Sequence, residues 1–452
     1  MIRSEIIDYL KDSQLVANIQ QFFGVSIHYG EHFGKHKTHE GSRSNDEGKC
    51  ICTEVDHNEA NHLLTCRNQK TNGCDTSSKE FNGYIRQTKL LQQQENDSDS
   101  ANKRRNGEET PAVLGKPQYT INNAFWYYLF LFGTELGDEI FYSAFIPFWF
   151  WNVDGAVGRR VVLVWAIVMS IGQALKDVIR WPRPACPPAA RLQYKWSQEY
   201  GMPSTHAMIG VSIPFSVVLF TMNRYIYPIH IGCIIAFLWC ILVSTSRLYL
   251  GMHTVLDIVV GVILAIVLMI PLVPLVDTMD SYIVTNFWCL VILVAISIMA
   301  IVYYPCSDKW TPTRGDTTMV VSVTAGVHAG AWLNYYTGVL SKPLFSPPYH
   351  IIWPTYPMFG RLIFRTVLGF CSIIATKAIC KSFSYATICA ILRINSKELM
   401  KSQDYSGNPN KVFVDLVYKY LCCFMIGVNT VYLLPNVFGM LGIERPTFYT
   451  EI

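Results

Sequence analysis

The sequence predicts an all-α protein, a polytopic bundle of eight to ten transmembrane helices that follows a largely disordered polar N-terminal region. Two observations lead to this prediction. Only 15% of the 452 residues are charged and 51% are hydrophobic, whereas soluble domains average about 25% charged residues. The 70 charged residues are also unevenly distributed, because 32 of them lie in the first 122 residues. This composition, with a net charge of only +4, excludes a single soluble globule, a disordered scaffold and a nucleic-acid binder with a strongly basic face.

The polar N-terminal region covers residues 1–115. It opens with an amphipathic stretch from Glu5 to Phe23, whose apolar residues recur at helical spacing and could contact a membrane surface. From Gly24 onward the chain is rich in Asn, Gln, Ser, Lys and Glu, a composition typical of disorder. A Cys and His cluster in this tail could form a zinc knuckle, but its spacing matches no strong zinc pattern, so we expect it to be disordered and to hold no metal. The cluster comprises Cys50, Cys52, His57, His62, Cys66 and Cys74.

Residues 116–452 form the predicted transmembrane domain, with its catalytic core at about 158–276. A bilayer core of about 30 Å requires about 20 apolar residues in a helix. Most of the apolar runs of this length are apolar on all sides, as expected for helices in lipid or in a bundle core. A shorter run at 383–393 is ambiguous. The long runs lie near 124–151, 158–178, 207–223, 226–246, 254–276, 282–304, 318–340, 361–380 and 414–441.

The first of three polar clusters lies at the end of the second run and contains Lys176 and Arg183. Pro182 and Pro184 break the helix there and turn the chain, so that Arg183 can point back towards Lys176. Taken alone, the cluster fits equally well a pair of basic residues that anchor a helix end at the level of the lipid headgroups.

The second cluster, with Ser204, Thr205 and His206, immediately precedes the third run. Ser204 or Thr205 can cap the helix, whose free backbone N–H groups then form an anion site. Taken alone, this cluster slightly favours a plain N-cap next to an incidental histidine.

The third cluster joins the fourth and fifth runs and contains Arg247, His253 and Asp257. The histidine and the aspartate are four residues apart and share one helix face, so Asp257 can hold one ring nitrogen and direct the other outward. Asp257 is the only carboxylate in its run, and a charge there costs about 2.5 to 3.5 kcal/mol on insertion scales. An unpaired structural role is therefore disfavoured.

All three clusters fall on the same aqueous side if each run crosses the membrane once. Together they supply three fixed cations, a hydroxyl with helix amides, two histidines and one aspartate, a set that fits a dianionic phosphate. One histidine held by a carboxylate can act as nucleophile, and the other can protonate the leaving oxygen. The three clusters contain no grouped carboxylates, no Walker loop and no His-Glu-x-x-His pattern. The chemistry predicted is phosphate monoester hydrolysis without a metal or another cofactor.

The three clusters resemble the signature motifs of the type-2 phosphatidate phosphatase superfamily. These motifs are Lys-x6-Arg-Pro from Lys176, Pro-Ser-x-His ending at His206, and Ser-Arg-x5-His-x3-Asp ending at Asp257. The resemblance implies a phosphohistidine mechanism, in which His253 attacks phosphorus, Asp257 orients His253, and His206 protonates the leaving alcohol and later activates water. It also implies a set of groups that hold the phosphate oxygens: Lys176, Arg183, Ser204, Arg247 and, through its backbone amide, Thr205. The superfamily usually has glycine at the last of these positions.

Further segments resemble the sphingosine-1-phosphate phosphatase branch of that superfamily. The resemblance runs from about residue 116 to the C-terminus and implies an endoplasmic reticulum membrane enzyme that dephosphorylates sphingoid base 1-phosphates, with its site facing the lumen. The segments are 132–139, 180–184, 202–208 and 313–318.

Four charged residues in these segments are candidates for recognition of the substrate headgroup. Glu135 and Asp138 interrupt the first run, where an unpaired charge is costly. A sphingoid phosphate carries an ammonium that a glycerolipid phosphate lacks, and we hypothesise that Glu135 or Asp138 binds it. Arg314 and Asp316 lie on the same side and could border the headgroup or pair structurally.

Other functions stay open at this point. Within the enzyme class, the substrate could be a broader lipid phosphate, a polyprenyl phosphate or a sugar phosphate, because the motifs do not select the organic part. A transporter or channel for an anionic solute would also use intramembrane cations, but it has no need of the two histidines. An inactive scaffold is disfavoured, since no motif position with side-chain chemistry is lost. The partners predicted are a lipid phosphate and membrane lipids, with no nucleic acid, and the sequence does not predict an oligomeric state.

Overall fold

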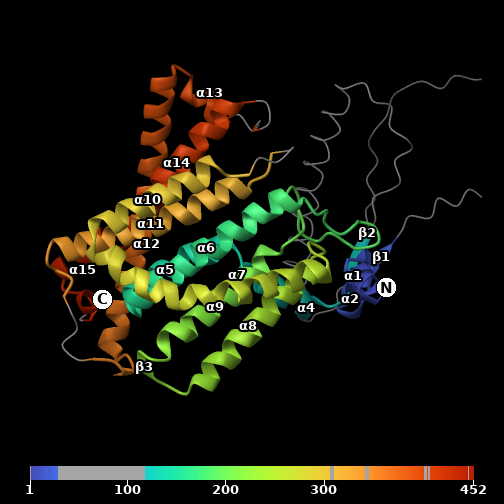
Figure 1. The fold of residues 1–452 in the computed structure, drawn as a ribbon, viewed down its shortest axis with the longest axis horizontal. Coiled ribbons are helices and arrows are strands. Elements are labelled where there is room, and N and C mark those ends of the chain that lie inside the picture. Colours follow the sequence, from blue (N-terminus) through green and yellow to red (C-terminus); the bar gives the residue numbers. More distant parts are fainter. Residues whose placement is uncertain are drawn as a thin grey trace, which may run out of the picture. The chain divides into compact units, whose positions relative to one another are not determined.

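The computed structural model describes residues 2–28, 118–305, 310–341, 346–401, 405, 408–445 and 447–451. These parts are largely helical, as the sequence predicts (Figure 1). The N-terminal tail from residue 29, with its Cys and His cluster, lies outside the described residues. Residues Met1–His28 and Pro117–Ile452 belong to one compact unit, so the first helices pack with the bundle.

The described helices follow one another with mostly short connections, and two small sheets join distant segments. Strand β1 (Val25–His28) pairs antiparallel with β2 (Gln118–Ile121), and β3 (Tyr225–Ile226) pairs parallel with β4 (Tyr349–His350). The helices are α1 (Ile2–Leu10), α2 (Ser13–Phe22), α4 (Ala124–Glu135), α5 (Glu139–Asn152), α6 (Gly155–Ile179), α7 (Thr205–Thr221), α8 (Ile229–Tyr249), α9 (Val255–Thr285), α10 (Phe287–Val302), α11 (Thr313–Tyr336), α12 (Tyr356–Leu392), α13 (Ser396–Lys401), α14 (Pro409–Val428) and α15 (Leu434–Met440). A π-helical turn, Asn429–Leu433, joins the last two.

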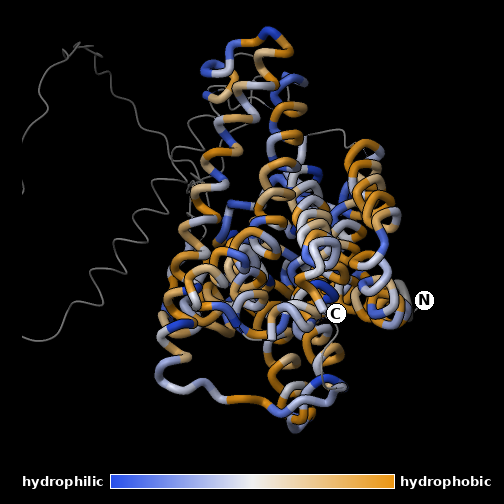
Figure 2. Tube along the Cα trace, turned by 90° about the vertical axis from the view of Figure 1, so that its left-hand side faces the viewer, coloured by the Kyte–Doolittle hydropathy of each residue, from blue (hydrophilic) through white to orange (hydrophobic). Residues whose placement is uncertain are grey.

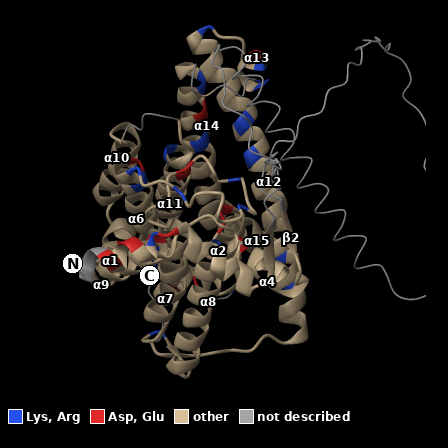
Figure 3. Ribbon diagram, turned by 90° about the vertical axis from the view of Figure 1, so that its right-hand side faces the viewer, with Lys and Arg blue, Asp and Glu red and all other residues tan. Residues whose placement is uncertain are grey.

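Five helical segments among the described residues are long and apolar enough to cross a membrane: α6, α8, α9, α12, and α14 with α15. Helices α7 and α10 are apolar but shorter. Hydrophobic residues extend along most helices in Figure 2, and the bodies of α7 and α8 are almost free of charge in Figure 3. The chain therefore has the composition of a multi-pass membrane protein. The ambiguous run at 383–393 is not a separate helix, since it continues α12.

The first apolar run, 124–151, is not one helix but two. Helix α4 ends at Glu135 and α5 begins at Glu139, so the break falls on the acidic segment that the sequence places inside a span. Gly137 occupies the break, where a Cβ atom would lie 2.9 Å from His206 Cδ2. The break thus packs against the second motif, and membrane proteins tolerate irregular backbone where it is buried in protein.

Helix α7 packs against α6, α8 and α9. Its N-terminus adjoins the C-terminal end of α6 and the N-terminal end of α9, because Ser204 N–H donates to the Asp257 carbonyl oxygen (3.1 Å). Gly261 permits this approach, since a Cβ atom there would lie 2.8 Å from the Ser204 carbonyl oxygen. Packing of α7 between its neighbours therefore brings the second and third motifs together.

The N-terminal helix α1 contacts α9, and helix α2 packs on the bundle against α8. Val16, Ala17 and Gln20 form its buried face, whereas Ile6 and Phe22 are exposed. The exposed apolar residues are compatible with the membrane-surface contact that the sequence predicts, which stays a prediction.

The other end of α6 is held by a buried ionic network. Arg159 donates from Nε and Nη2 to the two carboxylate oxygens of Asp280 at 2.9 and 3.2 Å. Arg159 Nη2 also donates to the Glu451 carbonyl oxygen, and a Glu451 carboxylate oxygen accepts from Gly155 N–H. The start of α6 is thus tied to the end of α9 and to the C-terminal segment.

Candidate active site

Lys176 lies on the last turn of α6, with its side chain almost fully buried. Its Nζ atom donates to Glu199 Oε2 at 2.5 Å and to Thr205 Oγ1 at 3.0 Å. The helix ends three residues later, at Ile179, and its C-cap residue Arg180 adopts a left-handed conformation with φ of 56°. The first motif is therefore joined directly to the start of α7.

Arg183 crosses from the first motif to the third. Its Nε donates to the Glu199 carbonyl oxygen at 2.8 Å, and its Nη1 donates to the Met252 carbonyl oxygen at 2.7 Å. Nη1 also lies 3.5 Å from His253 Nε2. These carbonyls fix the guanidinium plane next to the histidine.

Glu199 is a site residue that the sequence analysis missed. Besides the Lys176 contact, its Oε2 lies 3.7 Å from Arg183 Nη2, and the carboxylate is buried. One sequence signal could have revealed it, because Glu199 is the only carboxylate between Asp177 and Asp257. A lone acid in a loop that carries several basic residues is a natural partner for buried cations.

The second motif directs polar groups inward from the N-terminus of α7. Ser204 is the N-cap residue, but its side chain makes no capping hydrogen bond. Its buried Oγ has no hydrogen-bond partner among the described residues, and the same holds for His206 Nε2. The capping role predicted for the Ser204 side chain is thus not observed, and the hydroxyl stays available for a ligand.

Arg247, at the end of α8, has no exposed surface. Its Nη1 donates to Thr134 Oγ1 at 2.6 Å and to Gln193 Oε1 at 2.8 Å, two partners that the sequence analysis also missed. Its Nε and Nη2 have no partner among the described residues. The guanidinium is therefore held at one nitrogen and keeps donors for an anion.

His253 and Asp257 lie close together, with 3.7 Å between Nδ1 and Oδ2. This separation exceeds a hydrogen bond, and Asp257 Oδ2 instead accepts from Thr254 N–H at 2.8 Å in a capping box at the start of α9. The orienting role of Asp257 stays a prediction. Burial lowers the pKa of His253 well below its usual value, and the nearby cations Arg183, Arg247 and Lys176 lower it further. The imidazole is consequently neutral at neutral pH.

The structure thus brings all three clusters to one place. Six buried polar atoms of the three clusters have no partner among the described residues, an unusual state for buried polar groups. Three cations and two carboxylates leave the site with a positive charge when both histidines are neutral. An anion that accepts several hydrogen bonds would satisfy both the charge and the donors. The six atoms are Ser204 Oγ, His206 Nε2, Arg247 Nε and Nη2, His253 Nδ1 and Asp257 Oδ1.

Comparison with known proteins identifies the family. Residues 158–280 match the model of the PAP2 superfamily. The chain is 37% identical over 325 residues to sphingosine-1-phosphate phosphatase 1 of Rattus norvegicus, covering 72% of this chain and 74% of that protein. The chain belongs to the sphingosine-1-phosphate phosphatase family of the PAP2 superfamily. Sphingosine-1-phosphate phosphatase 2 of Mus musculus is 35% identical over 333 residues, 72% of this chain and 91% of its own length.

A more distant relative lies outside the animal proteins of this sphingosine-1-phosphate phosphatase family. Lipid phosphate phosphatase delta of Arabidopsis thaliana is 28% identical over 264 residues, covering 55% of this chain and 60% of that protein. No solved structure matches the chain.

Two of the four headgroup candidates, Glu135 and Asp138, lie next to the candidate active site. Glu135 is exposed and follows Thr134, the partner of Arg247. Asp138 is buried and its carboxylate accepts from Lys195 Nζ at 2.9 and 3.1 Å. Glu135 therefore has the freer carboxylate.

The other two candidates have protein partners. The Arg314 guanidinium donates twice to the Ile301 carbonyl oxygen, at 2.9 and 3.1 Å. Asp316 is buried and lies 3.5 Å from Nε2 of Gln173, one turn before Lys176 on α6. These carbonyl contacts give Arg314 a structural role. The contact of Asp316 is with Gln173 rather than with a motif residue.

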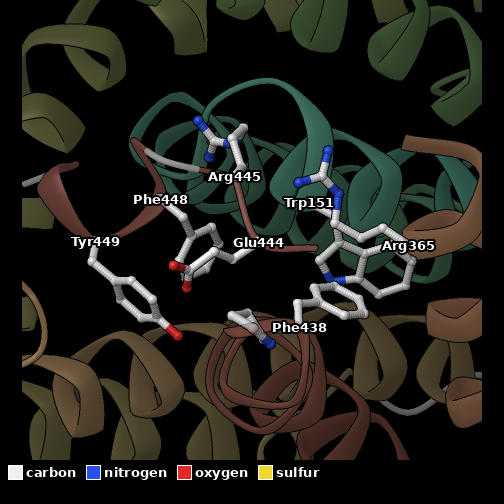
Figure 4. Close-up of a pocket in the computed structure, with 8 residues that line it drawn as sticks. Trp151, Arg365, Phe438, Glu444, Arg445, Phe448 and Tyr449 are labelled. Atoms are coloured by element: carbon white, nitrogen blue, oxygen red, sulfur yellow. The ribbon is translucent and has the colours of Figure 1, made fainter. Parts of the chain in front are cut away.

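A small pocket lies away from these motifs (Figure 4). It is lined by Trp151, Arg365 and Arg445, among others. Arg445 pairs with Glu451, which also binds the backbone at the first residue of α6. The pocket is thus at the opposite end of α6 from Lys176 and contains no motif residue.

Proposed function

We propose that this protein is a membrane-embedded, metal-independent lipid phosphate phosphohydrolase that acts on sphingosine 1-phosphate and related sphingoid base 1-phosphates. One observation carries the proposal: two histidines and three cations from separate segments meet at one buried place within a chain of the sphingosine-1-phosphate phosphatase family. The enzyme class is phosphoric monoester hydrolase, and no cofactor takes part.

In the proposed first step, His253 Nε2 attacks the phosphorus atom and the phosphorus–oxygen bond to the lipid breaks. Nε2 is the attacking atom because it faces Arg183, whereas Nδ1 faces Asp257. The leaving lipid oxygen takes a proton from His206, which becomes protonated when the dianionic phosphate binds, and Asp257 stabilises the charge on the modified imidazole. Lys176, Arg183 and Arg247 hold the phosphate oxygens, assisted by the Ser204 hydroxyl and the Thr205 amide.

In the second step, water attacks the phosphohistidine. His206, now neutral, accepts the proton of this water, and the phosphorus–nitrogen bond breaks to release inorganic phosphate and neutral His253. One histidine thus acts first as acid and then as base.

We assign recognition of the substrate ammonium to Glu135. The ammonium of a sphingoid phosphate lies one carbon from the phosphate-bearing carbon, next to the leaving oxygen. Gly137 brings the break between α4 and α5 against His206, and Glu135 lies two residues before it, so we place the ammonium of the bound substrate next to this break. Asp138, bound to Lys195, is the weaker candidate of the pair.

We further propose eight to ten spans in an endoplasmic reticulum membrane, with the active site on the lumenal side. The pair α4 and α5, together with α7, α10 and α11, would add spans to the five long helical segments. This topology is consistent with all three motifs at one end of α6, α7 and α9.

Phosphate release by purified protein in detergent, with a chelator present, tests the proposal. We expect activity in the wild type and losses of at least about 100-fold in His253→Ala, His206→Ala and Asp257→Asn. Activity that requires added divalent metal, or that persists in His253→Ala, would refute the mechanism. Glu135→Gln should lower turnover of sphingosine 1-phosphate more than that of phosphatidate, with Glu139→Gln as the exposed neighbouring control. An equal loss on both substrates would remove the ammonium assignment.

A further inference from the structure

Gln20, on the N-terminal helix α2, is fully buried although it lies far from the catalytic motifs in sequence. It shares the buried face of α2 with Val16 and Ala17 and is the only polar residue of that face. A buried side-chain amide is destabilising unless its donors and acceptor are satisfied. The partners of Gln20 therefore show which segments α2 holds in place.

The partners belong to two segments that carry phosphate-binding residues. Gln20 Nε2 donates to the carbonyl oxygens of Ala190 at 2.6 Å and Tyr249 at 2.8 Å, and its Oε1 accepts from Ala190 N–H at 2.8 Å. Ala190 lies in the loop between Arg183 and Glu199, and Tyr249 lies two residues after Arg247. One amide thus bridges the loop of the first motif and the end of α8.

The join at which Gln20 sits is closely packed. Leu192 N–H donates to the Leu250 carbonyl oxygen at 3.0 Å. Gly251 has φ of +66°, and a Cβ atom there would lie 2.1 Å from the Ala190 carbonyl oxygen and 3.0 Å from Gln20 Nε2. A second contact from the same helix, Ser13 Oγ accepting from Ala185 N–H at 2.9 Å, holds the loop two residues after Arg183.

We propose that Gln20 is a positioning residue of the phosphate site. It fixes the separation between Arg183, on the loop, and Arg247, on α8, so that both guanidinium groups face the same anion. Helix α2 is then a working part of the catalytic unit, although the three motifs lie wholly outside it. This inference rests on the proposed phosphatase function, because its readout is the binding and release of phosphate.

Two cations bind one anion together only when they are held at the right distance from each other. Arg183 is held by the carbonyls of Glu199 and Met252, and Arg247 by Thr134 and Gln193. Each guanidinium is rigid within its own segment, so their relative position depends on how the two segments are joined. Loss of the Gln20 bridge lets the segments shift, and a displacement of about 1 Å can lower catalysis about 100-fold.

The test compares Gln20→Met, Gln20→Glu and Gln20→Ala with the wild type in the full-length protein. Methionine keeps the volume of the side chain but not its hydrogen bonds, so α2 can stay packed. Glutamate keeps the acceptor for Ala190 N–H but places a carboxylate against two carbonyl oxygens. Gln21→Ala, at the exposed neighbouring position on the same helix, is the matched control.

For the monodisperse fraction of each variant, we expect kcat/KM for sphingosine 1-phosphate to fall about 10- to 100-fold. The inhibition constant of inorganic phosphate should rise as kcat/KM falls, and it should rise more in Gln20→Glu than in Gln20→Met or Gln20→Ala. Both constants of Gln21→Ala should stay within about twofold of wild type. A purely structural role would lower the yield of folded protein but leave both constants unchanged, and that result would overturn the inference. An inactive wild type would instead refute the proposed function, so the two failures are distinguishable.

Discussion

Lys176 and Glu199 form a buried ion pair inside the proposed phosphate site, with 2.5 Å between Nζ and Oε2 and side-chain exposures of 1% and 4%. Such a pair must overcome a large loss of hydration, and removal of one partner leaves the other charge buried without compensation. Glu199 also approaches Arg183, so one carboxylate stabilises two of the three cations. The carboxylate keeps the cations in place and leaves a net positive charge for the substrate.

We expect Glu199→Gln to lower kcat/KM for sphingosine 1-phosphate about 100-fold, because breaking a buried pair removes about 3 kcal/mol of interaction. The amide keeps the shape of the side chain but no longer compensates Lys176. Steady-state kinetics in detergent measures the effect. The exposed neighbour Gln198 supplies the control variant Gln198→Ala, and wild-type kinetics in Glu199→Gln would show that the carboxylate has no positioning role.

The activity should persist to a pH below the usual pKa of histidine, about 6.5. The nucleophile reacts as neutral imidazole, and burial together with neighbouring cations holds the pKa of His253 well below its usual value. A lowered pKa moves the acid limb of kcat/KM, which reports the free enzyme, to lower pH. The second pKa of the substrate phosphate, about 6, also affects the acid limb, but it does so equally in the wild type and in every variant.

Arg183→Gln and Arg183→Lys separate the charge of the guanidinium from its shape. Loss of the charge should raise the pKa of His253 and move the acid limb upward by about one pH unit. Lysine keeps the charge but not the two-point geometry, so the rate should fall with little movement of the limb. Identical pH profiles for the two variants would argue against an effect of this cation on His253.

Different substitutions separate the observed capping contact of Asp257 from its proposed catalytic role. Asp257→Asn keeps an oxygen that can accept from Thr254 N–H, so α9 should retain its cap while the rate falls by at least about 100-fold. Asp257→Ala should in addition lose about 1 kcal/mol of stability. Thr254→Ala removes the other half of the capping box and should lower stability by about 1 kcal/mol with most activity retained. Thermal unfolding and kcat, measured together, check these expectations, and a fully active Asp257→Asn would contradict the catalytic role.

The assembly of the three motifs could be predicted because ionisable groups in an apolar chain are rare and costly. Lys176, His206 and Asp257 each lie at the end of an apolar run, and the parity of the runs places them on one side. The helices that carry these groups could also be predicted, because a long apolar run is recognised from the local sequence alone.

The remaining parts of the site depend on contacts that no periodic pattern carries. Glu199 lies in an irregular loop, so its carboxylate could have faced water. Gln20 meets Ala190 across 170 residues of sequence. The break at Gly137 arises from packing against His206, whereas hydropathy alone favours an unbroken helix. Conversely, the polar residues near Lys381 lower the hydropathy of α12 but do not interrupt its backbone hydrogen bonds, so the helix continues.

Arg159 and Asp280 form a buried ion pair at the end of α6 away from the candidate active site. Asp280 is fully buried and also lies 3.5 Å from His328 Nε2, whereas nearby Asp277 pairs with Arg160 and is 65% exposed. Asp280→Asn should lower stability by about 3 to 5 kcal/mol, because Arg159 stays buried without its partner. Asp277→Asn removes an exposed pair and should change stability by less than about 1 kcal/mol. Thermal unfolding in detergent compares the two, and KM of the folded fraction should stay at the wild-type value in both. Equal unfolding midpoints would mean that the buried pair does not hold α6 against α9.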